Sequence, residues 1–199
     1  MKVIDVANFF ITVGSYNEGS EMTNARINKL LYFAQGRHLA AYGKPLFDEK
    51  IEAWKFGPII EEIYHSFKSY GNNIITKTKG EFDIEEMDDD DFQFLSDVFT
   101  NYADYSTSAL IDKTHENGSP WSQVYIPNKN VVIPQKLMKE YFSKMPTMRT
   151  VSDSLQNIPT IGYINDEGYT VLPKRYDDWR FAIRYKKNYP LIWIVHYLL

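Results

Sequence analysis

The side chains best suited to chemistry in this chain are its four histidines, His38, His65, His115 and His196. No two of them stand three or four residues apart, the spacing that places two imidazoles on one helix face around a metal ion. The chain contains no cysteine, which excludes disulfides, thiolate–metal sites and cysteine nucleophiles. No nucleophile-elbow, phosphate-loop or dinucleotide motif occurs either. We therefore predict no metal site and no bound cofactor.

The segment Thr114–Trp121 (THENGSPW) is one unusual cluster of functional side chains. An enzymatic interpretation makes His115 and Glu116 a general base or a ligand pair. Adjacent residues on a helix point about 100° apart, so these two are poorly placed to act on one atom. We favour a helix C-terminus that Gly118 caps and that Trp121 covers. We therefore predict no catalytic residues, and a small hydrolase using His115 and Glu116 is the alternative.

A second cluster, residues 52–58 (EAWKFGP), combines two aromatic side chains with a Gly-Pro pair. Such a platform suits stacking on an extended peptide, and it equally suits a structural corner that anchors the next helix. The aromatic content of the chain, 16%, favours a binding surface, because Tyr and Trp are enriched at interfaces. We predict a partner-binding groove near six residues: Trp54, Phe56, Pro58, Tyr64, His115 and Trp121.

The charge distribution bears on possible partners. A net charge of −4 argues against broad nucleic-acid binding, which depends on clustered Lys and Arg. The basic stretch Arg175–Lys187 keeps a nucleic-acid regulator open as an alternative. Residues 81–91 (EFDIEEMDDDD) carry eight acidic side chains ahead of an apolar helical pattern. They predict a helix N-terminus, where carboxylates cap free N–H groups, in preference to an acidic docking surface or a calcium loop.

Apolar spacing predicts a series of helices. The clearest begins at Thr23 or Asn24, either of which can cap it, and ends at Gly43. A further helix is expected to open at Gly57-Pro58, because proline suits the first helical position. Additional helices are expected over residues 5–13, 92–102, 107–116 and 134–145.

The remaining predicted elements are extended. Residues 46–56 are expected to have an extended backbone. Thr160–Leu172 is expected to be a hairpin, with alternating apolar residues flanking the turn 165–168. Leu191–Leu199 is β-branched and aromatic and is expected to be a strand. It is far shorter than the roughly 20 residues of a membrane helix.

These elements predict an α+β fold, with a mainly helical domain and a small C-terminal β-containing appendage. Residues 146–199 contain seven Lys and Arg against five Asp and Glu, a formal charge of +2, whereas the rest of the chain is acidic. We therefore predict a helical domain over residues 1–145 and an accessory β-containing segment over residues 146–199. The N-terminal stretch lacks the cleavage site of a signal peptide, so we expect a cytoplasmic protein without a membrane segment.

Several blocks of residues occur in an order typical of one family. They are TNARINKLLYFAQG (23–36), GKPLF (43–47), IEAWKFGPII (51–60), Thr114-His115-Glu116 and Pro120-Trp121. In these blocks the chain resembles the Panacea-domain antitoxins, also described as SocA-like or phage-associated proteins. Ile27 stands where that family usually has Leu, and Phe33 where it usually has Tyr. Residues after Pro146 lie outside the resemblance.

The resemblance implies a bacterial or phage antitoxin that neutralises a cognate toxin by direct contact. Some members of that family are described as adaptors that present the toxin to an ATP-dependent protease, and the resemblance implies this second role as well. The family carries no established catalytic residues, so the matching positions are expected to serve folding or binding. The expected partners are therefore a toxin protein and an ATP-dependent protease, with no membrane and no nucleic acid.

Overall fold

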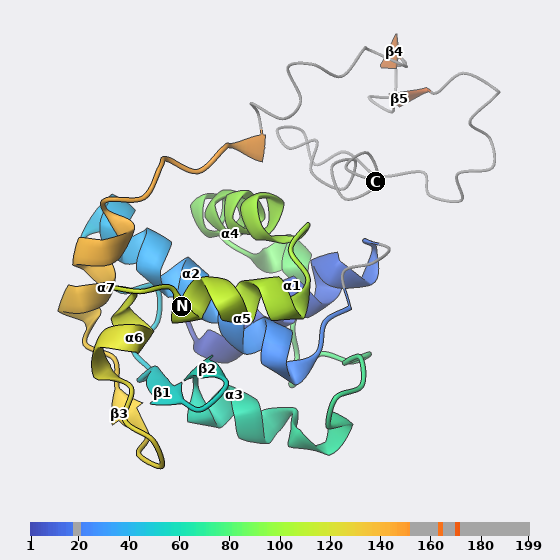
Figure 1. The fold of residues 1–199 in the computed structure, drawn as a ribbon. Coiled ribbons are helices and arrows are strands. Elements are labelled where there is room, and N and C mark those ends of the chain that lie inside the picture. Colours follow the sequence, from blue (N-terminus) through green and yellow to red (C-terminus); the bar gives the residue numbers. More distant parts are fainter. Residues whose placement is uncertain (18–20, 152–162, 165–169, 172–199) are drawn as a thin grey trace. The chain divides into compact units, whose positions relative to one another are not determined.

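The computed structural model describes residues 1–17, 21–151, 163–164 and 170–171 (Figure 1). The chain divides into two compact units, Met1–Met148 and Arg149–Leu199. Most described elements belong to the first unit, and they confirm the mainly helical α+β class. Its α-helices are α1 (Val3–Ser15), α2 (Asn24–Tyr42), α3 (Glu61–Ser66), α4 (Asp89–Tyr102), α5 (Thr107–His115), α6 (Pro120–Val124) and α7 (Gln135–Phe142).

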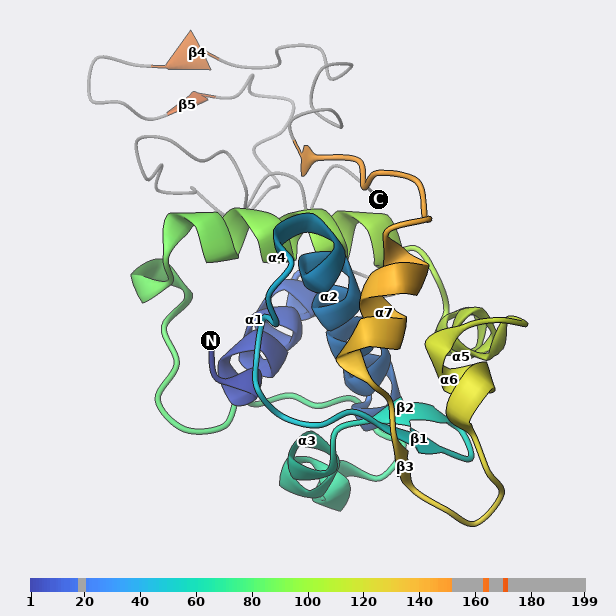
Figure 2. The same ribbon diagram turned by 90° about the vertical axis from the view of Figure 1, so that its left-hand side faces the viewer.

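Helix α2 runs through the middle of the first unit, with α1, α4, α5 and α7 around it (Figures 1 and 2). It starts and stops as the sequence predicts. The Thr23 side chain accepts a hydrogen bond from the Arg26 backbone N–H, and Gly43 ends the helix in a left-handed conformation at φ 73°. Because neighbours surround α2, its buried residues include polar ones as well as Ile27 and Leu30. The hydrophobic core is therefore organised around one central helix.

A three-stranded antiparallel sheet in the order β2-β1-β3 lies at one end of this unit, beside α3 (Figure 2). Its strands are β1 (Glu52–Trp54), β2 (Gly57–Ile59) and β3 (Val131–Val132). The prediction that Gly57-Pro58 opens a helix is wrong, because both residues belong to β2 and α3 begins at Glu61. Gly57 has φ 98°, outside the helical region. Pro58 lies on an edge strand, where a missing N–H is tolerated.

The other predicted helices of the first unit are present. The Asp88 side chain caps α4 by accepting from the Asp90 backbone N–H, as the acidic stretch predicts. The Ser106 side chain caps α5 in the same way. The sequence did not predict α6, although Ser119 at its N-cap and Pro120 at its first position are ordinary helix-start residues. This short helix carries Trp121.

The second unit is described by one pair of strands. Strands β4 (Tyr163–Ile164) and β5 (Thr170–Val171) pair antiparallel, with Tyr163 opposite Val171, which agrees with the predicted hairpin. The predicted strand Leu191–Leu199 and the basic stretch Arg175–Lys187 lie outside the described residues. The assignment of residues 146–199 as an accessory segment stays a prediction. Across the described residues of both units, no helix combines the length and apolar character needed to cross a bilayer.

Candidate partner-binding site

The β1–β2 hairpin places Phe56 at its tip. Trp54 pairs with Gly57, so the turn consists of Lys55 and Phe56 alone. The Phe56 side chain is 69% exposed, the most exposed large hydrophobic side chain among the described residues. The Lys55 ammonium lies 5.3 Å from the centre of the Phe56 ring. An exposed aromatic at the tip of a tight turn is a ready contact for another protein.

Lys29 of the central helix holds the second strand of this hairpin. Its side chain is 1% exposed, and its Nζ donates a hydrogen bond to the Pro58 carbonyl oxygen at 3.0 Å. Burial lowers the pKa of Lys29 from 10.5 to about 7. Gly57 packs directly on this side chain, and a Cβ there would lie 2.7 Å from Lys29 Cε and 2.9 Å from Thr114 Oγ1. The hairpin therefore has little room to shift relative to α2.

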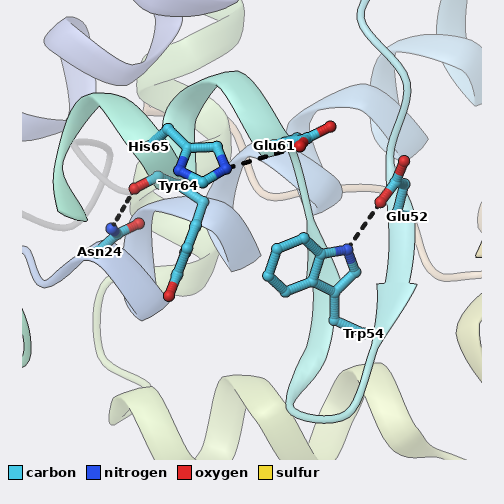
Figure 3. Close-up of polar contacts among 6 residues, drawn as sticks. All are labelled: Asn24, Glu52, Trp54, Glu61, Tyr64 and His65. Atoms are coloured by element: carbon cyan, nitrogen blue, oxygen red, sulfur yellow. Dashed lines mark hydrogen bonds and ion pairs between the residues drawn. The ribbon is translucent and has the colours of Figure 1, made fainter. Parts of the chain in front are cut away.

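Two asparagines of α2 hold the residues that follow the hairpin. Asn28 Oδ1 accepts a hydrogen bond from the Ile60 backbone N–H at 2.8 Å. Asn24 Nδ2 donates to the Tyr64 carbonyl oxygen at 2.9 Å (Figure 3). Asn28 Nδ2 also donates to Asn24 Oδ1, which links the two amides. These bonds fix the start of α3, and thus Tyr64, to the same helix that holds Pro58.

Helix α6 holds the first strand of the hairpin. The Trp121 indole N–H donates to the Trp54 carbonyl oxygen at 2.9 Å. Trp121 is 9% exposed and lies between two rings, with His115 3.8 Å away and Tyr125 stacked at 4.4 Å between centroids. Gly118 precedes α6 with φ 80°. Trp121 thus covers the end of α5, as the sequence predicts, and reaches the hairpin as well.

Trp54 and Tyr64 form a half-exposed aromatic surface beside the hairpin tip (Figure 3). Their ring centroids are 5.1 Å apart and the planes are tilted by 56°. The Trp54 indole N–H donates to Glu52 Oε2 at 2.8 Å, which fixes the indole orientation. On the α3 side, His65 Nε2 lies 3.6 Å from Glu61 Oε1. The surface is therefore aromatic at its centre and carboxylate-bearing at its margins.

The six residues named from the sequence differ in their exposure. Trp54, Phe56 and Tyr64 present side-chain surface to solvent, whereas Pro58 and Trp121 are buried. His115 is half-buried against Trp121. The structure brings Trp54 together with Tyr64 through ring contact, and Trp54 together with Trp121 through a hydrogen bond.

His115 and Glu116 have different neighbours. His115 Nε2 is buried without a hydrogen-bond partner among the described residues. Burial and the nearby charge of Lys29 lower the His115 pKa, against a smaller opposing effect of Asp112. The Glu116 carboxylate instead accepts a hydrogen bond from the Tyr141 hydroxyl at 3.2 Å. This arrangement gives no support to a hydrolase built on the two residues.

Metal binding also finds no support in the described part of the chain. No group of three or more His, Asp or Glu side chains gathers there in a way that could hold an ion. The acidic stretch before α4 provides helix caps, with Asp83 accepting from the Glu85 N–H and Asp88 from the Asp90 N–H.

Sequence reasoning missed the polar residues of α2 that hold the site. Asn28 and Lys29 receive no role from the sequence, because apolar spacing treats Asn and Lys as surface residues. The feature that identifies them is a polar side chain within a helix that is buried on every side. The buried polar residues of α2 are Asn24, Arg26, Asn28, Lys29, Gln35 and His38.

Comparison with known proteins agrees with the resemblance seen in the sequence. Residues 27–122 match the family described as "Antitoxin SocA-like, Panacea domain". The chain is 32% identical over 112 residues to Antitoxin SocA of Caulobacter vibrioides (strain NA1000 / CB15N). The aligned region covers 52% of this chain and 60% of that protein. The chain thus spans less than two thirds of the length of this relative. No solved structure matches it. The match over residues 27–122 includes most of α2, the β1–β2 hairpin, α3 and Trp121, and in this region the chain is similar to the Panacea-domain antitoxins.

Proposed function

We propose that this protein is an antitoxin that neutralises a toxin by direct protein–protein contact through the β1–β2 hairpin. The similarity of residues 27–122 to the SocA-like Panacea family supports the antitoxin role. The observation that carries the binding site is the exposed Phe56 at the tip of a hairpin held by buried side chains on both strands.

Rigidity is the physical reason for assigning contact to this hairpin. Ordering a loop on binding costs free energy, and a loop already fixed in the free protein avoids that cost. Lys29 fixes β2 through the Pro58 carbonyl, and Trp121 fixes β1 through the Trp54 carbonyl. Phe56 can therefore enter a pocket of the toxin without loss of hairpin freedom. Trp54 and Tyr64 supply the adjoining contact area.

The other three residues that the sequence analysis named have a positioning role in this proposal. Pro58, Trp121 and His115 hold the hairpin and the neighbouring ring surface in place, and they do not themselves cover the toxin. The binding surface in this proposal consists of Trp54, Phe56 and Tyr64.

The test is co-expression with the product of the adjacent reading frame. The neighbour alone should arrest growth, and co-expression of this protein should restore it. Phe56→Ala should lose most of the rescue, because aromatic anchors at interface centres account for a large share of binding energy. Ile74→Ala is a matched control, since Ile74 is an exposed apolar side chain (47%) outside the hairpin.

Several outcomes would contradict the proposal. They are a harmless neighbour, a toxicity that this protein does not change, or full rescue by the Phe56→Ala variant at wild-type abundance. The abundance of the toxin in the rescued cells also tests the adaptor role. Steric neutralisation leaves the toxin level unchanged, whereas delivery to an ATP-dependent protease lowers it and requires that protease.

A further inference from the structure

The ring surface beside the hairpin has a composition that points to the chemistry of its partner. We use the name aromatic platform for Trp54 and Tyr64 together with the carboxylates of Glu52 and Glu61. Figure 3 shows the indole of Trp54 next to the Tyr64 ring, with Glu52 on the strand and Glu61 on α3. The two rings are in contact at 5.1 Å between centroids, and both side chains are partly exposed to solvent.

The charges around the aromatic platform favour a cation. Glu52 Oε2 accepts the hydrogen bond from the Trp54 indole N–H, and Glu52 Oε1 makes no hydrogen bond to any described residue. Glu61 is 66% exposed, with His65 as its neighbour at 3.6 Å. Glu62 follows it and is also exposed. The nearest positive side chain in sequence, Lys55, lies over the ring of Phe56.

Aromatic faces and free carboxylate oxygens bind the same kind of group. The face of an indole or phenol ring carries negative potential and attracts cations within about 6 Å of its centre. A guanidinium is planar, so it can stack on a ring while its edge donates to a carboxylate. Lysine offers only a compact, strongly hydrated charge, which fits a flat ring surface less well.

We propose that the aromatic platform binds an arginine side chain of the partner protein, stacked on Trp54 and bonded to Glu52. This inference rests on the proposed function, because it names the chemistry of the toxin surface that the hairpin meets. Phe56 then supplies the apolar anchor, and the arginine supplies a charged contact beside it.

A peptide titration tests the arginine site without the toxin. The full chain, labelled with ¹⁵N, is titrated with three acetylated and amidated tripeptides, Gly-Arg-Gly, Gly-Lys-Gly and Gly-citrulline-Gly. The Trp54 indole N–H resonance is identified by its loss in Trp54→Phe. The arginine peptide should shift this resonance in a saturable way, the citrulline peptide should not, and the lysine peptide should bind more weakly.

The carboxylate is tested with a matched pair of variants. Glu52→Gln should weaken binding of the arginine peptide by about threefold or more, because it replaces a charge-assisted hydrogen bond by a neutral one. Glu140→Gln, which removes the same charge from α7, should leave binding unchanged. An absent shift, equal binding of the citrulline or lysine peptide, or equal effects of the two variants would overturn the inference.

A second measurement separates this inference from the proposed function. Glu52→Lys should weaken binding of the purified toxin at least tenfold, since it puts a like charge against the arginine. Wild-type affinity of Glu52→Lys for the toxin would contradict the arginine site and leave the antitoxin role standing. A toxin that does not bind the wild-type protein would instead contradict the proposed function, and the peptide titration would still decide whether the platform takes arginine.

Discussion

The ammonium of Lys29 lies 3.0 Å from the carbonyl oxygen of Pro58, so a buried side chain of the central helix holds the strand next to Phe56. This bond connects the central helix α2 to the strand beside Phe56, the most exposed large hydrophobic residue among those described. A lysine is an unusual choice for such a position, because burial disfavours its charge. The relationship makes the hairpin sensitive to the ionisation of Lys29.

Stability should depend on pH through Lys29. Its pKa is about 7 in the folded chain and near 10.5 when unfolded, so between these values the unfolded state binds one more proton. The free energy of unfolding should therefore rise from pH 7.5 to pH 9, by up to about 1.4 kcal/mol per pH unit. The measurement is urea denaturation at several pH values in that window.

The matched variant for this prediction is Lys29→Met, which keeps the length of the side chain. It removes the titrating group, so its pH slope in the same window should be flatter than that of the wild type. Parallel slopes for the two proteins would show that Lys29 keeps an ordinary pKa in the folded chain.

Gly57→Ala should destabilise the protein strongly. Gly57 has φ 98°, and its missing Cβ would lie within 3 Å of Lys29 Cε and Thr114 Oγ1. Strain and overpacking each cost about 1–3 kcal/mol. Gly80→Ala is the control, because Gly80 has a similar φ of 71° but open space around it. Thermal unfolding should show a larger loss for Gly57→Ala, and equal losses would mean that packing on Lys29 contributes nothing.

Trp121→Phe should weaken toxin binding, although Trp121 itself does not contact the toxin in the proposed complex. The change keeps a ring against His115 and removes the N–H that donates to the Trp54 carbonyl. We expect a loss of about 1 kcal/mol in stability and a several-fold lower affinity, because β1 loses one attachment. Tyr125→Phe, which alters the neighbouring stacked ring, is the control. An unchanged affinity of Trp121→Phe would remove Trp121 from the positioning role.

Local sequence rules predict most of the helices, but of the hairpin they predict only the first strand, β1, within the extended segment 46–56. Helix α2 begins after Thr23, whose side chain caps the first turn, and ends at Gly43, whose backbone adopts the left-handed conformation. Both effects are local to one turn of the helix. The prediction of a helix start at Gly57-Pro58 is wrong, because the same dipeptide suits either a helix start or an edge strand. Pairing with β1, which depends on the whole fold, decides between them.

The candidate site was predicted in part for a similar reason. Aromatic content drew attention to Trp54, Phe56 and Trp121, but sequence does not reveal which of them is exposed. The burial of Trp121 results from packing between α5 and α6, and α6 was not expected. The roles of Asn28 and Lys29 follow from the central position of α2, which no local pattern encodes.

The affinity of Phe56→Ala for the purified toxin tests the central claim most directly. The dissociation constant is measured by calorimetry for the wild type, for Phe56→Ala and for the control Ile74→Ala. We predict a loss of about 2 kcal/mol or more, roughly 30-fold, for Phe56→Ala, with an unchanged melting temperature because the ring is 69% exposed. Equal dissociation constants for Phe56→Ala and the wild type would contradict toxin binding through the hairpin.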